Sequence, residues 1–258
     1  MTHLSRLQRR VLPWVLPIGL IVLWGALSSM GWLSTRILPS PQSVARAGAH
    51  LIETGELFRH LEVSGGRAIA GLLIGGSIGF TLGLLTGISR LAEELLDSTL
   101  QMVRTVPNLA MIPLVILWFG IGEEAKLFLI ALGVFFPLYL NTYHGVRLVD
   151  PGLKEMGRVY GLSGWELFRQ VQLPGAMPSV LVGLRFALGS MWLTLIAAEA
   201  LAAERGIGYM TTTAREFMQT DVVIVGTLLY ALLGKLADVI ARMLEKRLLF
   251  WHPNFQKV

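Results

Sequence analysis

Charged side chains stand inside the long apolar runs of this sequence, and six of them are the first candidates for chemistry. They are Arg67, Arg104, Arg185, Glu199, Lys235 and Asp238. A charge inside an apolar segment is costly and marks a functional site by default, unless it reaches a surface or finds a neutralising partner. Lys235 and Asp238 have a helical spacing of three that lets them neutralise each other, so we expect structural roles for this pair and for Arg67. Arg185 and Glu199 are candidates for a polar pathway.

Catalytic patterns are missing from the sequence. There is no HExxH, no GxSxG, no cluster of carboxylates and no Walker A sequence, so the chain cannot hydrolyse ATP with a P-loop. The five histidines are scattered and there are no cysteines, which excludes disulfides, thiolate metal sites and a cysteine nucleophile. We therefore expect no catalytic residue, no metal site and no cofactor.

The composition is that of an integral membrane protein. Of the 258 residues, 53% are hydrophobic and 15% are charged, whereas soluble domains carry about 25% charged residues. The net charge of +5 does not indicate a nucleic-acid partner, because no basic run interleaves with aromatic residues. We expect membrane lipid as its surroundings.

Six apolar runs are long enough to cross a membrane as helices, since a span needs about 20 residues. They are residues 12–33, 65–88, 98–119, 125–145, 178–203 and 220–241. The first run follows Arg6, Arg9 and Arg10 and could be a secretory signal, but it is long and lacks a small-residue cleavage site, so we interpret it as an uncleaved span.

Lysine and arginine in the loops predict the orientation. With the N-terminus in the cytoplasm, 12 basic residues lie in cytoplasmic loops and tails and 6 on the other side. This predicts cytoplasmic N- and C-termini and a cytoplasmic loop at about residues 146–177.

The second and third spans have special patterns. Glycine recurs every fourth residue in the second span, at Gly71, Gly75, Gly79, Gly83 and Gly87. Such a stripe lets another helix backbone come close, so it predicts helix packing and is compatible with a sliding surface. In the third span, Pro107, Asn108 and Pro113 predict an interrupted helix, which is either a packed kink or part of a translocation path or gate.

The predicted cytoplasmic loop contains two short helices. Asp150-Pro151 is a good helix start, and Gly161 to Gly164 breaks the helix that follows. Ser163 and Glu166 form a capping-box pattern for a second helix, which we expect to end at Leu173-Pro174. An amphipathic connector lying on the membrane surface would have the same pattern.

The spacing within this loop resembles the EAA signature of ABC importer permeases, in which EAA, three residues, G, nine residues and IxLP follow one another. The matching residues are Glu155, Met156, Gly157, Gly161, Leu162, Val171, Leu173 and Pro174. Met156 and Gly157 replace the two alanines of the signature, and Val171 replaces the isoleucine.

The resemblance extends over nearly the whole chain, through "GWLSTRILPSP", "RTVPNLAMIPLVILWFGIGEEAK", "GLRFALGSMWLTLIAAE" and "GIGYMTTTAREFMQTD". These segments are similar to permeases of the sulfonate, taurine and nitrate subgroup, most of all to those for aliphatic sulfonates. The resemblance implies an all-α fold of the type I importer, with a first helix and linker at 1–59, a permease domain at 60–245 and a cytoplasmic tail at 246–258.

The same resemblance implies partners and a function. Residues 155–174 would dock onto an ATPase subunit present in two copies, a periplasmic binding protein would deliver the solute, and a second permease copy would complete a homodimer in the bacterial inner membrane. The expected function is import of aliphatic sulfonates, with taurine, nitrate or another small solute as alternatives. An ion-coupled secondary transporter would show inverted repeats and paired ionisable residues at mid-membrane, and no clear repeat is present. A membrane enzyme would need a catalytic constellation.

Overall fold

The computed structural model describes residues 6–34 and 37–251, and in these residues the chain is helical and contains no strand. The helices are α1 (Arg6–Ser29), α2 (Pro41–Glu53), α3 (Glu56–Ile88), α4 (Arg90–Arg104), α5 (Ile112–Phe119), α6 (Glu123–Arg147), α7 (Pro151–Val159), α8 (Gly164–Leu167), α9 (Leu173–Ala202), α10 (Ile207–Glu216) and α11 (Thr220–Leu248). A 3₁₀ turn at Asn108–Met111 precedes α5, and a π turn at Phe168–Gln172 joins α8 to α9.

Four continuous helices are long and apolar enough to cross a membrane: Glu56–Ile88, Glu123–Arg147, Gly164–Ala200 and Thr220–Leu248. They contain the predicted spans two, four and six and all but the last three residues of span five. In α1 the apolar segment Val15–Ser29 is shorter than a full span. Among the described residues the structure therefore supports four spans, or five if the bent pair that contains α5 is one span, and the predicted six with cytoplasmic ends remain a prediction.

The predicted third span, 98–119, is interrupted, as its two prolines predicted. Arg90–Arg104 and Asn108–Phe119 are bent against each other by 86°. Pro107 directly precedes the 3₁₀ turn and Pro113 lies in the first turn of α5. Proline fits the first turn of a helix, where no intrahelical N–H bond is needed, so each proline begins a new segment instead of kinking an old one.

Helices α3 and α6 pack through the glycine stripe. All five stripe glycines are buried. A Cβ atom added at Gly79 would lie 2.6 Å from the carbonyl oxygen of Phe135, and one at Gly83 would lie 2.7 Å from that of Tyr139. Gly75 faces the backbone of Ala131 in the same way. The backbone of α6 thus rests directly on the stripe, which only glycine permits.

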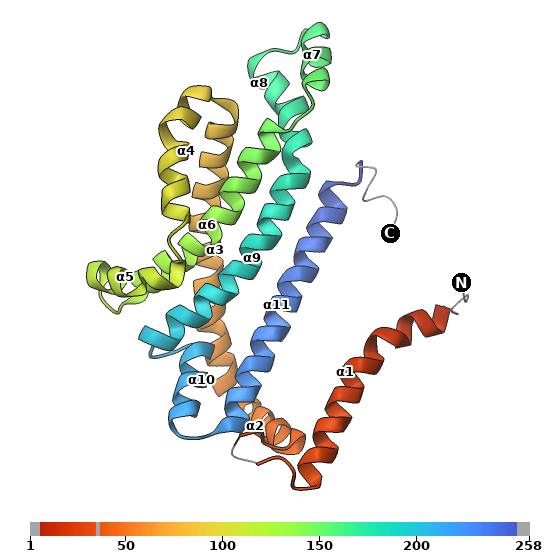
Figure 1. Ribbon diagram of the computed structural model, residues 1–258, viewed down its shortest axis with the longest axis vertical. Helices are drawn as coiled ribbons and strands as arrows, with labels where there is room; N and C mark the ends of the chain where they lie inside the picture. Colours follow the sequence, from red (N-terminus) through yellow and green to blue (C-terminus); the bar gives the residue numbers. More distant parts are fainter. Residues whose placement is uncertain (1–5, 35–36, 252–258) are drawn as a thin grey trace.

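Figure 1 shows how these helices are arranged. α3, α6 and α9 lie together, α11 runs along α9, and α7 and α8 project beyond the upper end of α9, while α2 and α10 lie at the opposite end. The largest buried cluster joins α3, α6, α9 and α11 through residues such as Ile130, Val134 and Leu195. Large apolar side chains remain exposed along the outer faces of the helices, as expected for a protein whose surroundings are lipid.

Candidate functional site

Helix α7 begins and ends as its sequence dictates. The carboxylate of Asp150 accepts a hydrogen bond from the N–H of Gly152 at 2.8 Å, and Pro151 occupies the first turn, which confirms the predicted start. At the other end, Gly161 has φ of +86°. The N–H of Gly161 bonds to Arg158 and the N–H of Leu162 bonds to Gly157, both through carbonyl oxygens. This pair of bonds is a Schellman motif, and it requires the left-handed conformation that glycine adopts without strain.

Residues of the EAA-like signature divide between the inside and the outside of this loop. A Cβ at buried Gly157 would lie 2.7 Å from the side chain of Leu167 and 3.3 Å from that of Val171. α7 therefore lies directly on the α8 segment, with Leu162 and Leu167 filling the contact. Glu155, Met156 and Gly161 remain exposed.

Two expectations about the second loop helix are wrong. The side chain of Ser163 makes no capping bond. The N–H of Glu166 donates instead to the backbone carbonyl oxygen of Ser163, at 3.0 Å. The helix also does not end at Leu173-Pro174 but continues through the π turn into α9. Proline has no N–H to donate and clashes with the carbonyl four residues before it. The wider π turn immediately before Pro174 accommodates both defects.

The surface of the loop carries exposed apolar side chains, although the exposed side chains around them are polar. Tyr160 is 80% exposed and Trp165 is 70% exposed, and Val159 is exposed beside them. A cavity of about 630 Å³ opens next to Trp165, lined also by Arg158, Leu162 and Phe168. Exposed apolar residues grouped around a cleft mark an interaction site for a protein, a ligand or a membrane.

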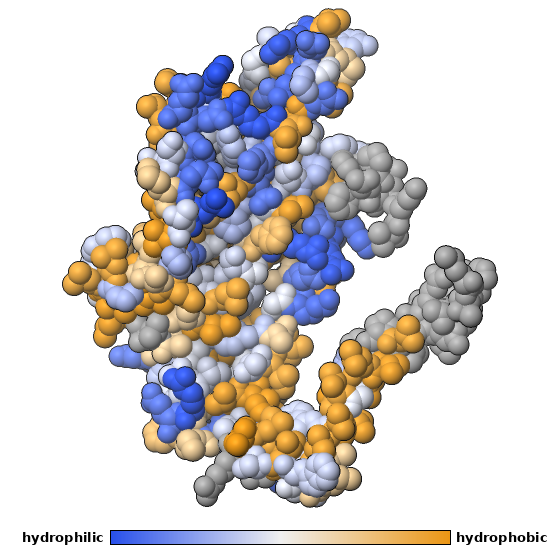
Figure 2. Space-filling view, viewed as in Figure 1, coloured by the Kyte–Doolittle hydropathy of each residue, from blue (hydrophilic) through white to orange (hydrophobic). Residues whose placement is uncertain are grey.

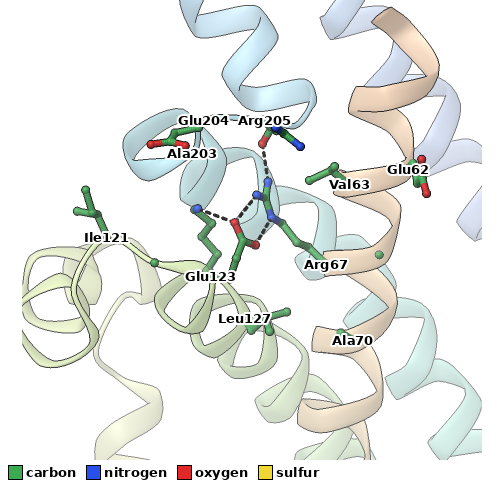
Figure 3. Close-up of a pocket in the computed structure, with 13 residues that line it drawn as sticks. Glu62, Val63, Arg67, Ala70, Ile121, Glu123, Leu127, Ala203, Glu204 and Arg205 are labelled. Carbon is green, nitrogen blue, oxygen red and sulfur yellow. Dashed lines mark hydrogen bonds and ion pairs between the residues drawn. The ribbon is translucent and has the colours of Figure 1, made fainter. Parts of the chain in front are cut away.

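A second group of polar side chains lies near the opposite end of the helices, centred on Arg67 of α3 (Figure 3). The buried guanidinium donates two hydrogen bonds to Glu123 of α6, at 2.5 and 2.6 Å. It donates two more, to Glu199 of α9 at 2.8 Å and to the carbonyl oxygen of Arg205 at 2.6 Å. Lys126 also bonds to Glu123. We call His60, Ser64, Arg67, Glu123, Lys126 and Glu199 the Arg67 cluster.

The Arg67 cluster caps α10. The N-cap residue of this helix, Gly206, has no side chain to accept hydrogen bonds. The three successive backbone N–H groups of residues 206–208 donate instead to His60 Nδ1 at 3.1 Å, Ser64 Oγ at 2.9 Å and Glu199 at 2.8 Å. Helix starts need such acceptors, and a carboxylate there also interacts favourably with the helix dipole. A cavity of about 1080 Å³ opens beside Arg67, Glu123 and Arg205.

The predicted pathway residues do not form one site. Glu199 belongs to the buried Arg67 cluster, whereas Arg185 pairs with Asp238 on α11 at 2.6 Å. Pro107 and Pro113 are exposed at the bend between α4 and α5, with Asn108 between them. Sequence reasoning missed His60, Ser64 and Glu123. The spacing of His60, Ser64 and Arg67, at i, i+4 and i+7, would have placed all three on one helix face.

Comparison with known proteins gives a consistent result. Residues 79–250 match the family described as "Binding-protein-dependent transport system inner membrane component". The chain is 60% identical over 254 residues to the aliphatic sulfonates transport permease protein SsuC of Escherichia coli (strain K12), covering 98% of this chain and 97% of that protein. It is 34% identical to the taurine transport system permease protein TauC of the same organism, over 98% of both chains.

The fold has a counterpart among solved structures. A chain from an inward-facing crystal form of the MetNI methionine ABC transporter superposes with a TM-score of 0.56 and 20% identity, covering 72% of this chain and 95% of that one. At this identity the likeness shows the fold alone, which is that of an ABC importer permease.

Proposed function

Because this chain belongs to the family of inner-membrane components of binding-protein-dependent transport systems, we propose that it is the permease subunit of an ATP-driven importer for aliphatic sulfonates. One observation supports the substrate most: the chain is 60% identical to a permease named for aliphatic sulfonates and 34% identical to one named for taurine. A taurine or nitrate permease of the same family is the alternative solute assignment.

The partners follow from the surfaces that the fold leaves open. The apolar surface of the α7–α8 loop, with Tyr160 and Trp165, is where the ATPase subunit docks, one copy for each of two permease copies. The cavity beside Trp165 receives a side chain of that subunit. A periplasmic binding protein delivers the solute at the α10 end. In this arrangement the permease domain spans residues 60–245, and residues 1–59 are an added helix and linker.

A growth experiment tests the substrate. Deleting the gene in a strain with no second sulfonate importer should stop growth on ethanesulfonate as the sole sulfur source, and growth on sulfate should continue. A plasmid copy should restore growth. Unimpaired growth on ethanesulfonate, or a defect confined to taurine or nitrate, would contradict the sulfonate assignment and leave the permease assignment standing.

Copurification tests the docking loop. Replacing Tyr160 or Trp165 by serine should reduce recovery of the ATPase subunit with tagged permease, because central apolar residues carry most of an interface's energy. Losing about 2 kcal/mol there weakens affinity roughly thirtyfold. Trp32→Ser, at an equally exposed tryptophan outside the loop, is the matched control.

Gly161, which lies between α7 and α8, gives a second test of the loop. Gly161→Val forces a β-branched residue into the left-handed region at a cost of about 1–2 kcal/mol, although no neighbouring atom lies within 4 Å of the added Cβ. Membrane abundance should stay near normal while ATPase recovery falls. Recovery at the wild-type level in both serine variants and in Gly161→Val would exclude this loop as the docking site. An ion-coupled carrier would instead recover no ATPase subunit even with the wild-type permease.

A further inference from the structure

Three basic side chains of α9 and α11 converge on one carboxylate. Asp238 of α11 accepts from Arg185 of α9 at 2.6 Å and from Arg242 at 2.9 Å, and the ammonium group of Lys235 lies 3.7 Å away. Three positive charges and one negative charge leave a net charge of +2. We call these four residues the basic notch.

The basic notch lies within the apolar length of its helices. Asp238 is ten residues from the end of α11, or about 15 Å along the axis, and Arg185 is twelve residues into α9, or about 18 Å. Large apolar residues are exposed on both sides, including Phe186, Leu193 and Leu236. Figure 2 shows hydrophilic surface along the upper half of α11 beside hydrophobic surface below. Unbalanced charge within an apolar length faces a water-filled space or other protein unless its side chain reaches the membrane surface, because lipid tails do not solvate it.

The basic side chains are accessible, unlike those of the Arg67 cluster. The exposed fractions of the side chains are 43% for Arg185, 54% for Arg242 and 68% for Lys235. In the Arg67 cluster the positive charges of Arg67 and Lys126 are matched by Glu123 and Glu199, and both cations are buried. The positive charges of that cluster are all balanced by carboxylates, whereas the basic notch has positive charge and hydrogen-bond donors left for a further anion.

A cavity of about 640 Å³ adjoins the basic notch. Arg185, Asp238 and Ser190 line it, and two glycines, Gly189 and Gly234, form part of its wall. A Cβ added at either glycine would meet no atom within 4 Å, so the space beside them is open. This volume falls in the range of about 300–1,000 Å³ that is typical of small-molecule sites.

We propose that the basic notch is a binding station for the anionic solute on its way through the permease. The sulfonate group has three oxygens, and its charge offsets part of the excess of Arg185, Lys235 and Arg242. A guanidinium group can bind two of these oxygens at once through two parallel hydrogen bonds. Asp238 keeps the three basic groups together between passages of solute, and the short apolar tail of an alkanesulfonate occupies the cavity. This inference rests on the proposed function, because it assigns a site to that solute.

Uptake by the reconstituted importer tests the station. The complex of permease, ATPase and binding protein is placed in vesicles of neutral lipid, and entry of labelled ethanesulfonate is measured. Arg185→Gln should lower uptake about tenfold or more, the usual effect of losing a hydrogen bond to a charged group. Arg185→Lys should retain part of it. Arg90→Gln removes an exposed arginine outside the notch and should leave uptake unchanged.

A second variant guards against a folding defect. In Gly189→Leu the new side chain enters the cavity, and its Cβ meets no atom within 4 Å, so it should block uptake while the melting temperature of the complex stays at or above the wild-type value. Normal uptake in both Arg185→Gln and Gly189→Leu would overturn the station and leave the sulfonate importer intact.

The remaining outcomes are also decisive. Failure of the wild-type complex to take up ethanesulfonate would refute the proposed function, and the station with it. Phospholipid phosphates offer the same anionic oxygens as the solute. If Arg185→Gln matches the wild type in neutral vesicles and differs only when anionic lipid is present, the notch binds lipid headgroups and the proposal is wrong.

Discussion

Replacing Gly79 by alanine tests whether α3 and α6 are held at the distance that the glycine stripe sets. The new Cβ would lie 2.6 Å from the carbonyl oxygen of Phe135 and 3.3 Å from its Cα. Ordinary contact begins at 3.4 Å. The opposing atoms belong to the backbone, so no side chain can rotate away and the two helices must separate.

The neighbouring Gly76 supplies the control. It is buried on the same helix, but a Cβ there would meet only side-chain atoms of Leu138 at 3.6 Å and Val134 at 3.8 Å. Both variants gain the same helix propensity, about 1 kcal/mol, so it cancels in the comparison. What remains is overpacking at Gly79, typically about 1–3 kcal/mol. Gly79→Ala should therefore be less stable than Gly76→Ala by about 2 kcal/mol.

Thermal unfolding of the detergent-solubilised permease measures this difference. For a chain of this size, 2 kcal/mol corresponds to roughly 4–8 °C in melting temperature. Gly76→Ala should melt at or above the wild-type temperature. Equal melting temperatures for the two alanine variants would show that α6 yields easily and that the stripe does not set the helix distance.

Two further predictions concern the α10 end. Glu199→Gln should destabilise the fold by about 3–5 kcal/mol, because it leaves the buried Arg67 short of a negative partner. Glu204 is an exposed carboxylate nearby, so Glu204→Gln should have little effect on the melting temperature. Equal melting temperatures for the two variants would contradict the role of Glu199. Met218 ends α10 with φ of +59°, so Met218→Gly should raise stability by about 1 kcal/mol and Met218→Ala should not, which thermal unfolding of both variants will decide.

The sequence predicts the long helices well because a span is a property of composition over a single segment. α3, α6, α9 and α11 all cover their predicted apolar runs. In the run at 98–119 the interruption was predicted but its angle was not, because hydropathy does not encode direction and the bend of 86° changes no residue's polarity. The sequence signal for the bend was present in Pro107 and Pro113, whose restricted backbone fits helix starts as readily as kinks.

Local features of the site can be predicted from the sequence, whereas features that depend on long-range contacts cannot. The left-handed Gly161 is readable, because a glycine that follows a helical stretch is the usual end of a helix. The partners of Glu199 are not, because Ser64 and Arg67 lie on α3 and Gly208 lies on α10, and only the fold brings these helices to α9. The pairing of Lys235 with Asp238 is predictable from its spacing, but the addition of Arg185 from another helix changes a balanced pair into an excess of positive charge.

One helix connects the α7–α8 loop, the basic notch and the Arg67 cluster. Residues Gly164–Ala200 form a continuous helix, about 50 Å long, that carries Trp165 near its start, Arg185 in the middle and Glu199 near its end. The Glu199 end is fixed by bonds to α3 and α10. A displacement imposed on the loop by a partner must therefore be taken up between these ends, at the π turn of Phe168–Gln172 or at Pro178 inside α9. Because Arg185 lies between these bending points and the fixed end, a displacement taken up at the bends leaves both the basic notch and the Arg67 cluster in place.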